Sequence, residues 1–243
     1  MLDDPMAKHS TFSVATRATK ALFSNLGVVL PLAVVLGAVV AGLDIGVGKI
    51  LAPKAFSGGT GADQSELVGL FLGWWGVVLL VELFLGPIVV AMSIYTARTY
   101  THGGSATLPK ALNFALARYG RIFKWHAAAW LSIQLGMIVL VPGILFLLQY
   151  AFVDSILVLE DERWPLARSG KLTRGRRGRI FALILPWLVV TQVIGFAELW
   201  ALQAGVASLV GLMTATYVVN IWVVMAFYVF YEDRTRTAPP PLP

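Results

Sequence analysis

The pattern of apolar and charged positions divides the chain into long uncharged runs separated by short basic segments. Runs without any Asp, Glu, Lys or Arg cover residues 21–43, 125–153, 180–197 and 199–231, and residues 67–97 are interrupted only by Glu82. Each run reaches the roughly 18 residues that a helix needs to cross a bilayer. The apolar positions do not alternate with polar ones, as they do in strands of membrane β-barrels. The pattern therefore predicts transmembrane helices.

The number of spans depends on residues 125–159. As one helix, these residues would be about 52 Å long, whereas the hydrocarbon core is about 30 Å thick. The pair Pro142-Gly143 lies in the middle, and such a pair is a turn signal. We therefore expect the chain to fold back at this pair. The predicted spans cover residues 22–46, 67–95, 125–141, 144–160, 180–199 and 208–231.

The positive charges support this division independently. Lys and Arg accumulate in the cytoplasmic loops of membrane proteins. With six spans, all Lys and Arg residues except Lys49 and Lys54 fall on one side, together with both termini. A five-span reading would place the basic segments 96–124 and 160–179 on opposite faces. The sequence predicts a multi-pass protein of the inner (cytoplasmic) membrane, with both termini in the cytoplasm.

A weak repeat accompanies the spans. Segments that mix basic and apolar residues at helical spacing precede each pair of spans, as expected for helices lying in the membrane interface. The predicted fold is an all-α polytopic transmembrane helix bundle, with six spans as three hairpins and short cytoplasmic interfacial helices. We expect a disordered N-terminus at residues 1–10, a membrane domain at residues 11–236 and a Pro-rich tail at residues 237–243.

Two stretches carry a resemblance to a known family. The first, residues 142–179, contains Pro142-Gly143, Glu160 at the end of the fourth span, and the pattern Arg168-Ser169-x-x-Leu172-Thr173-x-Gly175. The second is the ending "FYEDRTR", in which Phe230 and Glu232 replace the tyrosine and aspartate of the family pattern. The chain resembles the membrane domain associated with glycerophosphoryl diester phosphodiesterases and the standalone six-span bacterial proteins like it. The resemblance implies a six-helix membrane module, without phosphodiesterase activity, which belongs to a separate soluble domain.

Local chemistry suggests a role for several residues of the first stretch. Ser169 or Thr173 is expected to cap or back-bond a short helix, and Gly175 and Gly178 to end it with a positive φ. The acidic residues 160–162 are expected to pair with the basic cluster that follows.

That basic cluster allows two compatible interpretations. Its members are Arg168, Lys171, Arg174, Arg176, Arg177 and Arg179. The first interpretation is a topology signal that keeps the start of the fifth span in the cytoplasm. The second is a binding site for anionic lipid headgroups, because each basic residue near such a surface contributes about 1 kcal/mol.

Two carboxylates are predicted to lie inside the membrane. Glu82 falls near the middle of the second span, and Asp154 falls inside the fourth. A charged group there costs several kcal/mol unless it is paired, hydrated or neutralised. Each is either a ligand or protonation site in a cavity, or a structural contact, which for Glu82 would involve Gln134, Gln192 or Thr191. We assign no role to Asp44 or Glu198, which are expected near the outer interface.

Enzyme signatures are not found in the sequence. His9, His102 and His126 are scattered and show no metal-ligand spacing. We expect no cofactor, no metal site and no nucleic-acid partner. The favoured function is a non-enzymatic accessory or lipid-engaging membrane protein, in contact with anionic lipids and with a protein partner or a second copy. The alternatives are a small transporter or lipid-handling channel that uses the intramembrane carboxylates, and a membrane-embedded enzyme acting on lipid headgroups.

Overall fold

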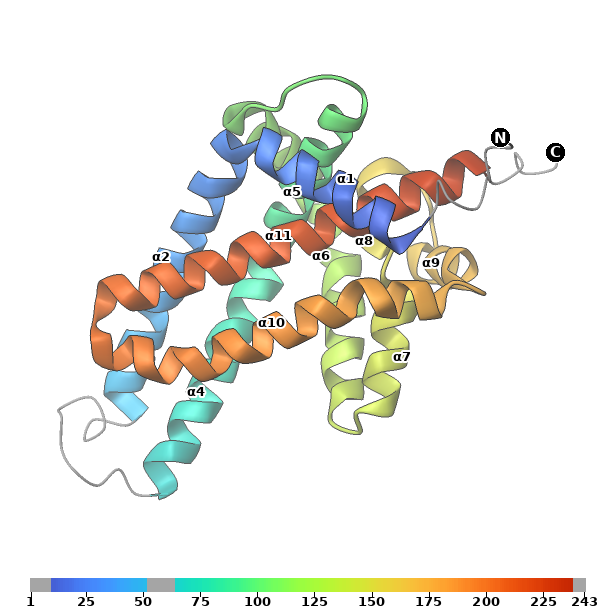
Figure 1. The fold of residues 1–243 in the computed structure, drawn as a ribbon. Helices are drawn as coiled ribbons and strands as arrows, with labels where there is room; N and C mark the ends of the chain where they lie inside the picture. The colour runs from blue at the N-terminus through green and yellow to red at the C-terminus, as the bar shows by residue number, and fades with distance from the viewer. Residues whose placement is uncertain (1–9, 52–63, 238–243) are drawn as a thin grey trace.

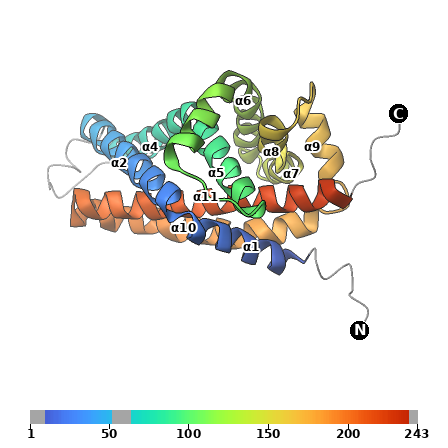
Figure 2. The ribbon, with the colours of Figure 1, turned by 90° about the horizontal axis from the view of Figure 1, so that it is seen from above.

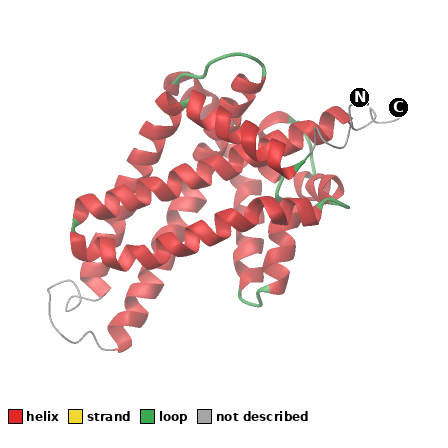
Figure 3. Cartoon of the chain, viewed as in Figure 1, coloured by secondary structure: helices red, strands yellow, loops and turns green. Residues whose placement is uncertain are grey.

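The described part of the chain is helical. The computed structural model describes residues 10–51 and 64–237, and these residues form helices and loops without a strand (Figure 3). The first helices are α1 (Thr11–Ser24), α2 (Leu26–Leu51), α4 (Gln64–Phe84), α5 (Gly86–Thr101) and α6 (Leu108–Met137). They are followed by α7 (Val141–Tyr150), α8 (Val153–Leu159), α9 (Pro165–Thr173), α10 (Arg177–Ala204) and α11 (Val206–Thr237). The all-α prediction is confirmed for this part. The predicted disordered N-terminus and Pro-rich tail lie, apart from Ser10 and Thr237, outside the described residues.

Four helical segments of the described chain are long and apolar enough to cross a membrane. They are Leu26–Leu51, Val141–Leu159 (α7 with α8), Arg177–Ile194 and Val206–Thr235. Each overlaps a predicted span. The other two predicted spans correspond to α4 with α5, and to the C-terminal half of α6.

A proline explains why the second predicted span is two helices. Pro87 has no N–H to donate to the carbonyl four residues earlier, and its ring clashes with that carbonyl. Helix α4 therefore ends at Phe84, and α5 begins at Gly86 with the proline in its first turn. The Tyr119 hydroxyl of α6 donates to the carbonyl of Phe84 at 3.0 Å.

The helices form two layers. Figure 2 shows α10 and α11 running side by side along one side of the molecule, next to α1, while α2, α4, α5 and α6 lie on the other. Helix α11 is the longest and packs against α1, α2, α5 and α10. In Figure 1 the turn between α10 and α11 lies at the left, the facing ends of α2 and α4 lie at the lower left, and the turn between α6 and α7 lies at the bottom. Helices α1 and α9 and the end of α11 lie toward the upper right.

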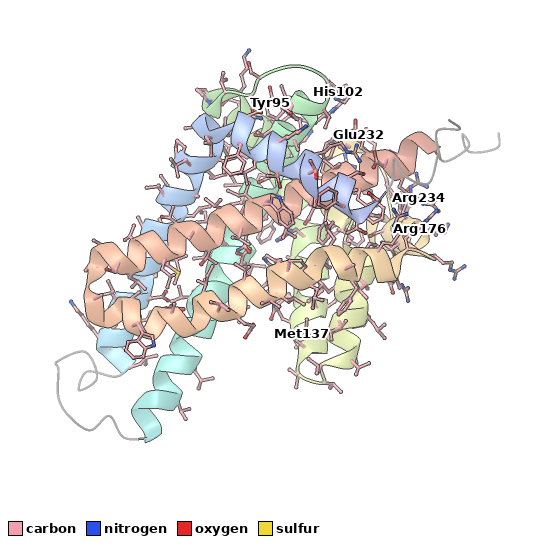
Figure 4. The ribbon with its side chains drawn as sticks, in the orientation of Figure 1. Tyr95, His102, Met137, Arg176, Glu232 and Arg234 are labelled. Atoms are coloured by element: carbon pink, nitrogen blue, oxygen red, sulfur yellow. The ribbon has the colours of Figure 1, made fainter. Side chains whose placement is uncertain are left out.

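The turn between α6 and α7 differs from the prediction. The chain reverses at Ile138–Leu140, and Leu140 has a φ of 61°. Pro142 lies in the first turn of α7, a position that proline favours. Gly143 lies inside α7, where a Cβ would come within 2.5 Å of the backbone nitrogen of Met137. Met137 is labelled in Figure 4. The Pro-Gly pair therefore begins the second helix of the hairpin and does not form its turn.

Three consecutive residues near the end of α11 tie that helix to three other segments. We call Tyr231–Asp233 the C-terminal clasp. Tyr231 Oη donates to Glu160 Oε1 at 2.5 Å, Glu232 Oε1 lies 3.9 Å from His102 Nε2, and Arg17 donates to both carboxylate oxygens of Asp233. Figure 4 shows His102 and Glu232 close together beside the end of α11. The clasp thus joins α11 to the end of α8, the end of α5 and the middle of α1.

Candidate binding cavity

A break between α7 and α8 places Asp154 at the start of a helix. The chain leaves the helical hydrogen-bond pattern around Ala151–Phe152, and α8 begins at Val153. The buried hydroxyl of Ser169, in α9, donates to the Gln149 carbonyl at 2.7 Å and accepts from the Phe152 N–H at 3.2 Å. Ser169 therefore bonds the backbone of the break, at the end of the short helix α7, and the predicted back-bond within α9 is made by Thr173.

Asp154 contacts a histidine of the neighbouring helix α6. Nδ1 of His126 lies 2.9 Å from Asp154 Oδ1, and the imidazole is 7% exposed. The two residues each lie 14 positions from Leu140, in the turn of the hairpin. They therefore face each other at the same level of the two antiparallel helices.

Glu82 reaches the same place from α4. A Cβ built on Gly86 would lie 3.0 Å from His126 Nε2 and 3.2 Å from Glu82 Oε2. Both side chains thus converge on the bare backbone of Gly86, at the break between α4 and α5. Nε2 of His126 is buried and has no hydrogen-bond partner among the described residues.

These three side chains line a cavity of about 530 Å³ between the two helix layers. Its other polar and aromatic walls include Gln134, Thr191, Gln192, Glu198, Thr216 and Asn220, and Trp130, Tyr150, Trp187, Tyr217 and Phe227. Among the described residues that line it, none is Lys or Arg. The cavity is therefore acidic and aromatic, and Trp187 Nε1 donates across it to Asn220 Oδ1 at 2.7 Å.

The structure brings together the two carboxylates singled out from the sequence, and it adds His126, which sequence reasoning set aside for lack of metal-ligand spacing. Glu198, to which no role was given, also lines the cavity. Asp44, to which no role was given either, is 8% exposed, and both its carboxylate oxygens lack a hydrogen-bond partner among the described residues. Its position near the outer interface stays a prediction.

The basic cluster lies apart from the cavity, in α9, the following loop and the start of α10. Lys171, Arg174 and Arg177 are exposed, and none forms an ion pair with another described residue. Arg168 pairs with Glu160 at 3.3 Å, and the Arg179 guanidinium lies 5.7 Å from the ring centre of Phe230. Arg176 is partly buried and is labelled in Figure 4 near the end of α11. Contact of this cluster with lipid headgroups remains a prediction.

The remaining local predictions around α9 had mixed outcomes. Gly175 has a φ of 75°, as expected, but Gly178 lies inside α10 and has no positive φ. The Thr173 hydroxyl bonds back to the carbonyl of Gly170 at 3.3 Å, as predicted. Asp161 pairs with Arg121 of α6 and not with the basic cluster.

Within the described residues, no group of three His, Asp or Glu side chains has the arrangement of metal ligands. Comparisons of the chain with known protein families, with curated proteins and with solved structures found no match. The resemblance to the phosphodiesterase-associated membrane domain therefore stays a prediction, and function has to be inferred from the cavity.

Proposed function

We propose that the chain is an integral membrane protein with six spans arranged as three hairpins, and with both termini in the cytoplasm. The positions of the turns and of the terminal helices support this arrangement, because they lie toward opposite ends of the molecule in Figure 1. In the proposed topology, α4 with α5 and the C-terminal half of α6 supply the two spans beyond the four long apolar segments. The loops that carry most of the Lys and Arg then share the cytoplasmic side.

The outer surface of α2 supports a lipid environment. Large apolar side chains that recur every four residues are exposed along this helix: Leu26, Leu30 and Val34, and beside them Val35, Val39 and Leu43. Soluble monomers rarely expose contiguous apolar patches of this kind. In a membrane the same stripe faces acyl chains without cost.

We propose that the protein is a small transporter that binds its solute in the cavity. The observation that carries this proposal is the convergence of Glu82, His126 and Asp154, from three different helices, on one wall of the cavity. Ionisable groups inside a membrane are costly, and they typically line substrate or ion pathways. A purely accessory or structural protein needs only a dry, packed bundle, and gains nothing from this arrangement.

Cysteine labelling tests the proposal, because the chain contains no cysteine. Thr191→Cys in α10 and Thr216→Cys in α11 place a thiol on the cavity wall. Ser93→Cys is the control, because Ser93 is buried in α5 and does not line the cavity. Oriented membrane vesicles are treated from either side with a hydrophilic, membrane-impermeant methanethiosulfonate.

We expect both cavity cysteines to react from each side, as alternating exposure of one site requires, and the Ser93→Cys control to remain unlabelled. Reaction from one side alone would contradict transport and leave a one-sided binding pocket. No reaction from either side would mean that the cavity is dry, and the proposed function would then be wrong.

A second proposed function concerns the basic cluster, and it is favoured because Lys171, Arg174 and Arg177 are exposed and form no ion pair with another residue that the structure describes. Here the cytoplasmic face holds anionic lipid headgroups, each basic residue contributing about 1 kcal/mol. The test replaces Arg174, Arg176, Arg177 and Arg179 by Gln together and measures anionic lipid that co-purifies with the protein. Reduced retention supports headgroup binding, whereas unchanged retention leaves the cluster as a topology signal.

A further inference from the structure

The hydrogen bond between His126 and Asp154 determines what the other ring nitrogen offers. An ionised carboxylate can only accept hydrogen bonds. With Asp154 ionised, the proton of the neutral imidazole lies on Nδ1, and Nε2 is left as an acceptor. This nitrogen is buried and unpartnered among the described residues, on the cavity wall. A buried acceptor without a partner is costly, so the site lacks a hydrogen-bond donor.

The second acceptor is a carboxylate at the same point. Glu82 Oε2 and His126 Nε2 both face the position that a Cβ on Gly86 would fill, at 3.2 Å and 3.0 Å. The two atoms therefore lie close to each other on the cavity wall, and one polar group in the cavity can bond both. The group that satisfies both carries at least two N–H or O–H donors and a positive charge that balances Glu82.

The rest of the cavity fits an apolar body that carries such a group. Its aromatic side chains, among them Trp130, Trp187 and Tyr217, present ring faces that attract cations and apolar groups. An anionic solute would meet Glu82 and Asp154 without any Lys or Arg among the described lining residues, and like charges in such a site repel. A neutral solute would not balance an ionised Glu82, and this residue would then have to take up a proton.

We propose that the solute is a protonated primary or secondary amine with an aromatic or aliphatic body. Its ammonium group lies in the cavity beside Glu82 and His126, donates one hydrogen bond to His126 Nε2 and pairs with Glu82. Its apolar body extends between α10 and α11 on one side and α6 on the other. This assignment rests on the proposed function, because it names the class of solute that the cavity takes.

The experiment measures protection of the cavity cysteine by three matched probes. The Thr191→Cys protein is labelled in detergent solution, where the probes do not differ through partitioning into lipid vesicles. The probes are 2-phenylethylamine, which is a cation at neutral pH, the neutral 2-phenylethanol and the anion 3-phenylpropanoate. We expect only the amine to protect, slowing the reaction about tenfold at a concentration ten times its dissociation constant. Equal protection by the alcohol, or stronger protection by the carboxylate, would overturn the amine assignment.

Substitutions then locate the ammonium group. Glu82→Gln and Gly86→Ala are each expected to abolish protection, the first by removing the charge and the second because the added Cβ pushes the His126 and Glu82 side chains out of position. The matched controls are Asp161→Asn, an exposed carboxylate, and Gly76→Ala, where an added Cβ meets nothing within 4 Å. Both controls are expected to keep the protection by the amine. Loss of protection in the controls as well would contradict the location.

The outcomes separate this inference from the proposed function. If the cysteine labels readily and no probe protects it, the cavity is hydrated as the proposed function requires, but the amine assignment is wrong. A cysteine that does not label at all overturns the proposed function itself. The comparison of the three probes uses intact Glu82 and Gly86, so it stands even where a substitution at either position prevents folding.

Discussion

Close packing of α6 against α7 predicts that adding one methyl group at Gly143 destabilises the protein. A Cβ at this position would lie 2.5 Å from the nitrogen and 2.6 Å from the Cα of Met137. Real Cβ atoms essentially never approach other atoms closer than 3.0 Å, and ordinary contact begins at 3.4 Å. Both contacts are with backbone, so a rotamer change does not relieve them and the two helices have to separate.

The magnitude follows from two opposing effects. Overpacking of this kind costs about 1–3 kcal/mol, whereas replacing Gly by Ala inside a helix gains about 0.5–1 kcal/mol. The two ranges combine to a loss of about 0–2.5 kcal/mol, and because both contacts are with backbone we expect Gly143→Ala to fall in the upper part, at about 1–2 kcal/mol. Gly120→Ala, in the same hairpin, is the matched control, because a Cβ there meets nothing within 4 Å. This control is expected to be neutral or stabilising.

The assay is reversible unfolding in mixed micelles of increasing SDS content, followed by far-ultraviolet circular dichroism. The expected result is an earlier unfolding transition for Gly143→Ala and an unchanged or later transition for Gly120→Ala. If Gly143→Ala proved as stable as the unsubstituted protein, the two helices would not be in the close contact described here, and the alignment of His126 with Asp154 would lose its support.

Three further predictions follow from local contacts. Ser169→Ala leaves a buried N–H and a carbonyl unbonded at the α7–α8 break, and should lower the free energy of unfolding by about 1–3 kcal/mol in the same assay. The control is Ser132→Ala, because the Ser132 hydroxyl bonds within its own helix. A loss for Ser169→Ala no larger than that of the control would contradict the role of Ser169. Tyr231→Phe removes the hydrogen bond to the Glu160 carboxylate at the end of α8, and should lower the free energy of unfolding by about 1.5–3 kcal/mol. The loss is measured as a shift of the SDS midpoint. An unchanged midpoint would show that this contact of the clasp adds no stability. Val139 lies in the exposed turn between α6 and α7, and Ser105 lies in the polar loop before α6. In the proposed topology these positions are on opposite sides of the membrane, so we expect an impermeant thiol reagent added to one side of oriented vesicles to label either Val139→Cys or Ser105→Cys. Labelling of both from the same side would contradict the six spans.

The helices themselves were the most predictable part of the fold. Long uncharged runs predicted α2, α10 and α11 to within a few residues at most ends, because a bilayer-length apolar run has no other stable structure. The breaks were harder to predict. Pro87 and Pro142 are both prolines in a first helical turn, but in the sequence Pro87 lay within one predicted span and Pro142 was taken as the turn itself.

The candidate site was predictable only in part. Glu82 and Asp154 stood out because buried charge is costly wherever the helices pack. His126 was missed because pairing in a hairpin depends on the position of the turn, which the apolar pattern does not fix. A turn centred between residues 142 and 143 sets position 126 opposite position 159, whereas the observed centre at Leu140 sets it opposite Asp154. A shift of a few residues in one loop therefore decides which groups meet.

The C-terminal clasp has a consequence for biogenesis. Its partners on α1, α5 and α8 are synthesised well before Tyr231–Asp233, since the ribosome makes the chain from its N-terminus. Until the last helix emerges, the earlier helices lack the contacts that join them at this end. A chain that stops before residue 231 would lack the contacts that join α11 to α1, α5 and the end of α8. The three segments, which are synthesised at different times, are therefore joined at this end only after the ribosome has released the last residues of α11.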